Sequence, residues 1–170
     1  MNGARCALIL VAAATLLTGC DTVNSAANGV SNPMTPEQSK SQVVDAATDA
    51  SRAIAKPVDS ANFSRSSCND QGDAPFRGVV TIAYQPPADP QAAAAEFGDM
   101  KQRLERAGWS ADSDFKSHAA TLKKGGVNAV LSPADASVAV VVVTLYGECR
   151  DVTTSKATKG DVEAIQLTAG

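Results

Sequence analysis

Apolar residues recur with two different periods along this chain, and the longer period predicts two helices. The first helix is predicted to begin at a capping box that spans Thr35 to Gln38 and to end before Pro57. One face of it carries apolar residues at helical spacing: Val43, Ala47, Ala50 and Ile54. The second helix is predicted from the cap Asp89 and the first-turn residue Pro90 to the C-cap Gly108, with a stripe formed by Ala93, Phe97, Met100, Leu104 and Ala107.

The shorter period predicts strands over residues 76–85, 114–123, 127–132 and 138–146. Lys124, Gly125 and Gly126 form a hairpin turn signal between the second and third of them. Residues 58–75 contain Cys68 and read as irregular, and 162–167 could add a short edge strand or helix. The expected fold is a single α+β domain: an about four-stranded, largely antiparallel sheet with two helices packed on one face. The order of the strands remains open at this stage.

The first residues of the chain have the pattern of a secretory signal peptide. Arg5 is followed by an apolar run from Ala7 to Leu17, which is too short to span a bilayer but typical of a signal peptide. The run ends in Leu17-Thr18-Gly19-Cys20, which resembles a bacterial lipobox. The resemblance implies cleavage before Cys20 and a diacylglyceryl group on its sulfur. Two acyl chains give stable membrane attachment, whereas one binds marginally.

These signals divide the chain into four parts. Residues 1–19 are predicted to be the signal peptide, and 20–35 a lipidated N-terminus with a tether rich in Asn, Ser and Ala. Residues 36–152 are predicted to form the α+β domain, and 153–170 a C-terminal tail. The expected location is the outer face of the cytoplasmic membrane.

The chain has four cysteines, and their positions predict one disulfide. Cys6 is lost with the signal peptide and Cys20 carries lipid, which leaves Cys68 and Cys149. Two remaining cysteines in an exported chain usually pair, because the compartment is oxidising. A metal site or two free thiols are the alternatives. Two distant cysteines and the chain's single histidine make a poor zinc site, so no metal is expected.

Composition and motifs indicate no recognisable chemistry. The net charge of −3 and the absence of a large basic cluster make a nucleic-acid partner unexpected. His118 is the only histidine, and no nucleophile elbow, metalloprotease motif or phosphate loop occurs, so neither catalytic residues nor a cofactor are predicted. Asn69, Asp70 and Asp73 could hold Ca²⁺, as could Asp112 and Asp114 more weakly, but a solvated turn explains them equally well.

Two cysteine contexts resemble a known family. Cys68 lies in Ser67-Cys68-Asn69-Asp70-Gln71-Gly72-Asp73-Ala74-Pro75-Phe76-Arg77-Gly78, and Cys149 in Tyr146-Gly147-Glu148-Cys149. Together with the lipobox, these segments resemble the small mycobacterial LppA-like lipoproteins over about residues 36–152. The resemblance implies a cell-envelope lipoprotein with an internal disulfide and transfers no activity.

Three function classes follow from this. The first is a non-catalytic binding or interaction module, monomeric and held on the membrane through Cys20, whose partner is an envelope protein or a small lipid or cell-wall ligand. The second is a structural accessory subunit of an envelope complex. The third is an enzyme whose site has no recognisable motif.

Overall fold

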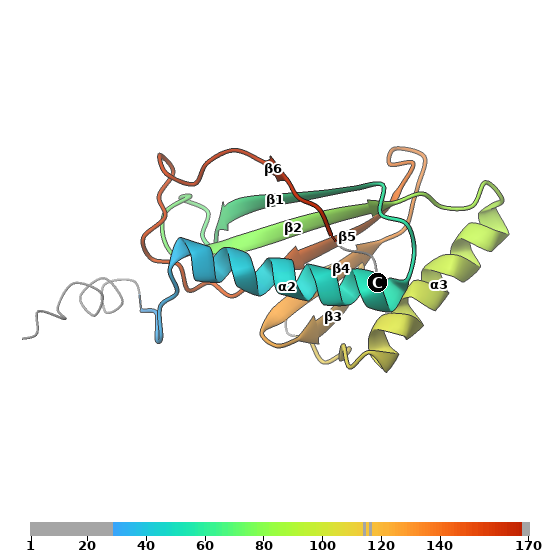
Figure 1. Cartoon of the computed structure of the whole chain (residues 1–170), viewed down its shortest axis with the longest axis horizontal. Helices are drawn as coiled ribbons and strands as arrows, with labels where there is room; N and C mark the ends of the chain where they lie inside the picture. The colour runs from blue at the N-terminus through green and yellow to red at the C-terminus, as the bar shows by residue number, and fades with distance from the viewer. Residues whose placement is uncertain (1–28, 114, 116, 168–170) are drawn as a thin grey trace, which may run out of the picture.

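Two helices lie on the same face of an antiparallel sheet in the computed structural model, which describes residues 29–113, 115 and 117–167 (Figure 1). The helices are α2 (Pro36–Ile54) and α3 (Pro90–Arg106). The sheet order is β3-β4-β5-β2-β1-β6. These strands are β1 (Ser60–Ser67), β2 (Phe76–Tyr84), β3 (Ala120–Lys124), β4 (Val127–Ser132), β5 (Val141–Tyr146) and β6 (Glu163–Ala164). The predicted α+β class is confirmed, but the sheet has six strands and not about four.

The strand that the sequence analysis missed is β1, in a segment that was expected to be irregular. Only two of its eight residues, Ala61 and Phe63, are apolar. Both are buried, while the other six are polar and lie at the surface or partly covered. Hydropathy therefore carries almost no strand signal here, and pairing with β2 from Ser60 to Ser67 makes the strand. The two-residue β6 pairs with β1 in turn, at Asn62 and Phe63.

Helix α2 has the N-terminus that its sequence predicts. Thr35 accepts a hydrogen bond from the backbone N–H of Gln38, and the Gln38 side chain accepts one from the backbone N–H of Thr35. The buried face contains Val43, Ala47, Ala50 and Ile54 as expected. The helix ends at Ala55, which takes a left-handed conformation with φ of 54°, two residues before Pro57. An alanine in that conformation gives no sequence signal, since glycine usually occupies it.

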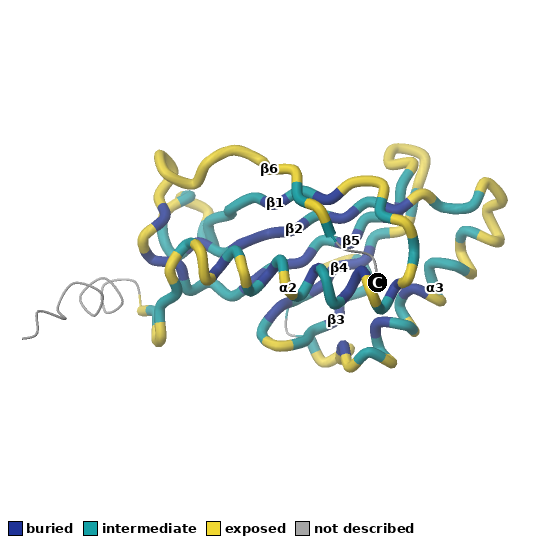
Figure 2. Tube along the Cα trace, in the orientation of Figure 1, coloured by how far each residue is buried: buried dark blue, intermediate teal, exposed yellow. Residues whose placement is uncertain are grey.

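The core lies between α2 and the central strands, and Figure 2 shows most of β2 buried. Val80, Ile82 and Tyr84 of β2 face Val141, Val143 and Leu145 of β5 across the sheet. Gly78 allows α2 to approach closely: a methyl group there would lie 2.7 Å from the Ser39 carbonyl oxygen and 2.7 Å from Val43 Cγ1. Helix α3 packs on α2 through Met100 and Leu104, and Trp109 closes the edge of the core.

The second predicted strand, which corresponds to β3, is shorter than its pattern indicated. The sequence analysis placed it at residues 114–123, but β3 begins at Ala120. Gly125 and Gly126 then connect β3 to β4, both with positive φ, as the glycine pair predicted. The start of the last strand also differs: Asp135 accepts hydrogen bonds from the backbone N–H groups of Ser137 and Val138, which keeps this segment in a turn until β5 begins at Val141.

Among the described residues, no helix is both long and apolar enough to cross a membrane. The predicted signal peptide and Cys20 lie outside the described residues.

Candidate functional site

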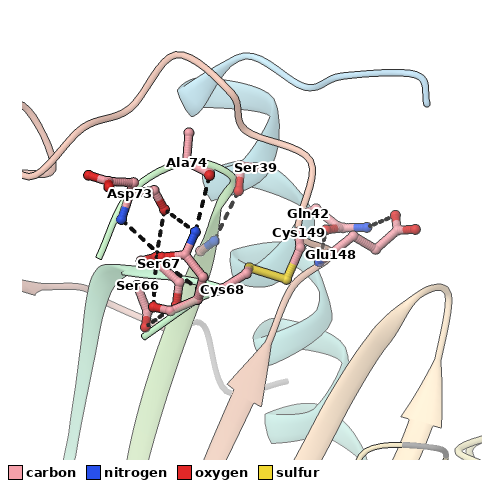
Figure 3. The surroundings of a disulfide bond; sticks show 11 residues. Ser39, Gln42, Ser66, Ser67, Cys68, Asp73, Ala74, Glu148 and Cys149 are labelled. Carbon is pink, nitrogen blue, oxygen red and sulfur yellow. Dashed lines mark hydrogen bonds between the residues drawn. A yellow bond between two sulfur atoms is a disulfide. The ribbon is translucent and has the colours of Figure 1, made fainter. Parts of the chain in front are cut away.

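A disulfide between Cys68 and Cys149 joins the ends of β1 and β5 (Figure 3). The two Cα atoms are 6.0 Å apart, and the residues are separated by 81 positions in the chain. Strands β2 and β5 are antiparallel neighbours, with Val79 opposite Tyr146. The beginning of β2 therefore meets the end of β5, and Cys68 lies next to Cys149 without a long connection. The order of the strands did not follow from the sequence, and the pairing of β2 with β5 decides this part of it.

Polar side chains of α2 fasten the helix to the same end of the sheet. The backbone N–H of Gly78 donates to Ser39 Oγ at 2.9 Å, and this hydroxyl is buried. Gln42 Nε2 donates to Glu148 Oε2 at 2.6 Å, while Gln42 Oε1 accepts from the Glu148 backbone N–H at 3.1 Å. Figure 3 shows Gln42 and Glu148 beside the disulfide. This reciprocal pair fixes the position of the segment that carries Cys149.

A buried carboxylate organises the chain after the disulfide. Asp151 is 1% exposed, and its side chain accepts hydrogen bonds from the backbone N–H and hydroxyl groups of both Thr153 and Thr154. Its backbone also bridges Met34 on one side and Phe76 on the other. All four of these hydrogen bonds come from the turn that Asp151 itself begins, so Asp151 is a structural residue. It sets the path of the chain toward residues 155–160.

The loop between β1 and β2 is closed by Asn69. Its Oδ1 accepts from the Asp73 backbone N–H at 3.1 Å, and its Nδ2 donates to the carbonyl groups of Asp73 and Ala74, each at 3.2 Å. Ser67 Oγ donates to the Asp73 carbonyl at 2.6 Å. Hydrogen bonds within the turn therefore occupy the Asn69 amide. This fits the interpretation of the segment as a turn, which was the alternative to a Ca²⁺ site. No group of three or more His, Cys, Asp or Glu side chains suited to a metal ion occurs in the described part of the chain.

A polar cleft of about 450 Å³ lies between this loop, the end of β1 and the turn at residues 155–160. Strand β6 covers β1 only at Asn62 and Phe63, so the outer edge of β1 is open to the cleft from Arg65 onward. Its lining combines three cationic side chains, several polar groups and one carboxylate: Arg65, Ser66, Ser67, Asn69, Asp70, Gly72, Phe76, Lys156 and Lys159.

Two of the three cations, Arg65 and Lys156, contact neutral groups. Arg65 Nη1 donates to the Lys159 carbonyl oxygen at 3.4 Å, and the guanidinium lies 5.2 Å from the centre of the Phe63 ring. Lys156 crosses Gly72, where a Cβ atom would lie 2.5 Å from Lys156 Cε. Gly72 has a φ of 75°, which favours glycine. The close contact with the Lys156 side chain favours glycine as well, because it leaves no room for a Cβ atom.

The charges of these cations are not neutralised by ion pairs. Within the described ranges, none of Arg65, Lys156 and Lys159 forms a salt bridge. The nearby Glu163 pairs with Lys40 instead, at 2.7 Å. Three cations and the single carboxylate of Asp70 thus make the cleft positive, although the whole chain has a net charge of −3.

A second cluster lies on the opposite sheet face. The Phe115 and Tyr146 rings stack with centroids 4.9 Å apart, and the Arg77 guanidinium lies 5.0 Å from the Tyr146 ring centre and 5.5 Å from that of Phe115. Burial lowers the pKa of Arg77, and Tyr146 opposes that shift. The cluster covers this part of the sheet with a cation–π stack.

Two hydroxyl groups are buried in the core itself. Tyr84 is fully buried on β2, and Ser51 is 1% exposed on α2. The Ser51 hydroxyl lies close enough to the Tyr84 phenol to influence its pKa. Neither oxygen makes a hydrogen bond of ordinary geometry among the described residues. Burial raises the pKa of Tyr84, and the Ser51 hydroxyl offsets part of that rise.

Sequence reasoning identified the disulfide partners but not the cleft. Cys68 and Cys149 follow from counting cysteines, whereas Arg65 lies about ninety residues before the two lysines. Only the spacing of Lys156 and Lys159, three residues apart in a segment expected to be a tail, could have drawn attention to the turn. His118 is exposed.

Comparisons with known proteins identify the family. A family model described as "Putative lipoprotein LppJ" matches residues 35–168. The relative of that name from Mycobacterium bovis is 35% identical over 161 residues, covering 88% of this chain and 83% of the relative, and the one from Mycobacterium tuberculosis H37Rv gives the same values. No solved structure matches the chain significantly.

The chain therefore belongs to a family of lipoproteins, and that family is LppJ. The resemblance to small mycobacterial envelope lipoproteins is confirmed. Membership places the chain among the membrane-associated proteins of the cell envelope.

Proposed function

We propose that this chain is a non-catalytic binding module, held on the outer face of the cytoplasmic membrane by lipid on Cys20, and that its cleft binds an anionic group. The observation that carries the proposal is the set of cations without ion pairs: Arg65, Lys156 and Lys159 line one cleft. Holding like charges side by side is unfavourable unless an anion or solvent compensates them. A bound anion would relieve this repulsion.

The signal-like start of the chain and the family support this location. The lipobox-like stretch at Leu17 to Cys20 implies lipid on Cys20, and the matching relatives are lipoproteins. A lipid on the first residue of the mature chain, after export, anchors the domain on the outer side of the membrane. Two acyl chains make this attachment stable.

The donor chemistry of the cleft favours phosphate or carboxylate groups over neutral sugars. An arginine guanidinium presents a planar set of N–H donors, and the two lysine ammonium groups act as mobile point charges. Lys156 and Lys159 are exposed, so solvent screens them and the affinity is expected to be modest. The side chains of Ser67 and Asn69 are engaged in the loop and shape the wall of the cleft.

The described residues form no recognisable catalytic arrangement, which supports a binding role. The only histidine of the chain lies exposed at position 118, and the buried carboxylate Asp151 is used in its own turn. General acid–base chemistry needs a titratable group positioned beside a reacting atom. The cationic side chains of the cleft are suited to hold a charge and not to transfer a proton.

The test is a titration of the mature chain from residue 20, carrying Cys20→Ser, with inorganic phosphate and glycerol phosphate at low salt. Backbone amide shifts in two-dimensional NMR spectra should change around residues 65–72 and 155–160. Replacing both Lys156 and Lys159 with alanine should weaken binding about tenfold or more. The control replaces Arg52 and Arg106, two exposed helical arginines, with alanine.

The outcomes separate the function classes. Localised shifts that disappear in the lysine variant and persist in the arginine variant support an anion-binding module. Shifts scattered over the whole surface, or equal in both variants, refute the cleft as a binding site. In that case, crosslinking in intact cells to one defined protein would favour the structural accessory subunit.

A further inference from the structure

The cleft lies at the end of the domain from which the chain leads back to its lipid anchor. Asp151 bridges Met34, near the first described residue, and also Phe76, which lines the cleft. Figure 1 shows the start of α2, the β1–β2 loop and the segment between β5 and β6 together at this end of the molecule. The first described residues and the cleft therefore lie at the same end of the domain.

The chain between the anchor and the domain is short. About 14 residues separate Cys20 from Met34, and they span at most roughly 50 Å when fully extended. A domain held within this distance meets the membrane surface continually. The effective concentration of lipid headgroups at the cleft is therefore high, and even weak single contacts produce substantial occupancy.

We propose that the cationic cleft docks on the phosphodiester headgroups of anionic phospholipids in the same membrane that holds Cys20. This inference rests on the proposed function, because it names the partner of the same site. Arg65, Lys156 and Lys159 contact the phosphate groups, and the domain sits on the bilayer through two attachments. The far end of α2 then points away from the membrane.

The distribution of charge supports a local and oriented contact. The chain as a whole is negative, so its general electrostatic field opposes approach to an anionic surface. The cleft is positive because its cations have no ion pairs, and Lys156 and Lys159 are exposed on a projecting turn. Some basic side chains elsewhere are matched: Lys40 pairs with Glu163, and Lys101 pairs with Glu105.

The size of the effect can be stated in advance. A basic side chain near an anionic membrane strengthens binding by roughly fivefold. Removing both lysines should therefore weaken binding to anionic vesicles about thirtyfold. Because the Debye length falls to about 3 Å at 1 M salt, high salt should remove the binding altogether.

The experiment measures cosedimentation of the mature chain from residue 20, carrying Cys20→Ser, with vesicles. One set is phosphatidylcholine alone, and the other is phosphatidylcholine mixed with phosphatidylglycerol. The variants are Lys156→Ala with Lys159→Ala, and the charge-matched control Arg52→Ala with Arg106→Ala. All four positions are exposed, so both variants should fold as the parent chain does.

The inference is supported if the chain binds the anionic vesicles but not those of phosphatidylcholine alone, and if salt weakens that binding. Binding should also be reduced in the lysine variant and kept in the control. Equal losses in the two variants overturn it, because they indicate diffuse electrostatics. Phosphate and glycerol phosphate binding at the cleft without vesicle binding overturns the membrane partner and leaves the proposed function intact. Absence of both kinds of binding refutes both.

Discussion

The close approach of α2 to β2 depends on the missing side chain of Gly78, and Gly78→Ala tests this contact. The added methyl group would lie 2.7 Å from the Ser39 carbonyl oxygen, 2.7 Å from Val43 Cγ1 and 3.2 Å from Phe63 Cε2. Favourable carbon contacts lie at about 3.5–4.0 Å. The helix must therefore move by close to 1 Å, because one of the crowded atoms belongs to its backbone.

That movement has two costs. Overpacking a well-packed interface costs typically about 1–3 kcal/mol. The hydrogen bond from the Gly78 backbone N–H to the buried Ser39 hydroxyl is 2.9 Å long and would be stretched, which adds about 1 kcal/mol. Gly78 does not have positive φ, so no backbone strain contributes. The expected loss of unfolding free energy is about 2–4 kcal/mol.

The matched control is Gly98→Ala in α3. A Cβ atom there has no atom within 4 Å, and alanine favours helices over glycine by roughly 0.5–1 kcal/mol. The same chemical change should therefore destabilise the protein at position 78 and stabilise it at position 98. Urea unfolding of the oxidised protein, followed by circular dichroism, gives both values. A Gly78→Ala protein as stable as the parent would show that α2 does not lie this close to β2.

Three further predictions concern the disulfide, the helix cap and the buried tyrosine. Replacing both Cys68 and Cys149 with serine should lower the unfolding free energy by about 4 kcal/mol in urea titrations, because the bond closes a loop of 81 residues; an unchanged midpoint would contradict it. Thr35→Ala should cost about 1 kcal/mol and lower the melting temperature, whereas an unchanged melting temperature would show that the cap contributes nothing. Burial raises the pKa of Tyr84, so the unfolded chain loses this phenolic proton at a lower pH than the folded chain does. The contribution of this pKa difference to folding stability is complete below about pH 10 and is lost as the pH rises toward the pKa of Tyr84 in the folded protein. In a Tyr146→Phe variant, phenolate absorbance should appear only together with unfolding, and ionisation of the folded protein near pH 10 would refute the assignment.

Local signals in the sequence determined the helices well. Thr35 and Gln38 specify a helix start through two reciprocal hydrogen bonds, and Asp89 with Pro90 does so for α3. Such signals succeed because capping and amphipathic periodicity act within a few residues of one another. The end of α2 was predicted less well, because Ala55 takes a left-handed conformation that an alanine in the sequence does not indicate.

Strand β1 was beyond that local reasoning, whereas β6 lies within residues 162–167, where a short edge strand or helix was expected as an option. Strand β1 contains two apolar residues, so its own sequence carries little strand signal. It forms because its backbone pairs with β2. Strand order was equally undecided, because pairing between β2 and β5 joins segments more than fifty residues apart. Long-range pairing of this kind is a property of the whole chain and leaves no trace in a short window.

The sequence by itself determined what is encoded by position and by count: two capped helices, an α+β class, two cysteines left to pair, and the expectation of lipid on Cys20. The tertiary structure alone decided where charge accumulates. Arg65 and the pair Lys156 and Lys159 become neighbours because β6 runs back along β1 and Asp151 directs the intervening turn. Electrostatic sites depend on distances in space, and those distances exist only once the strands have paired.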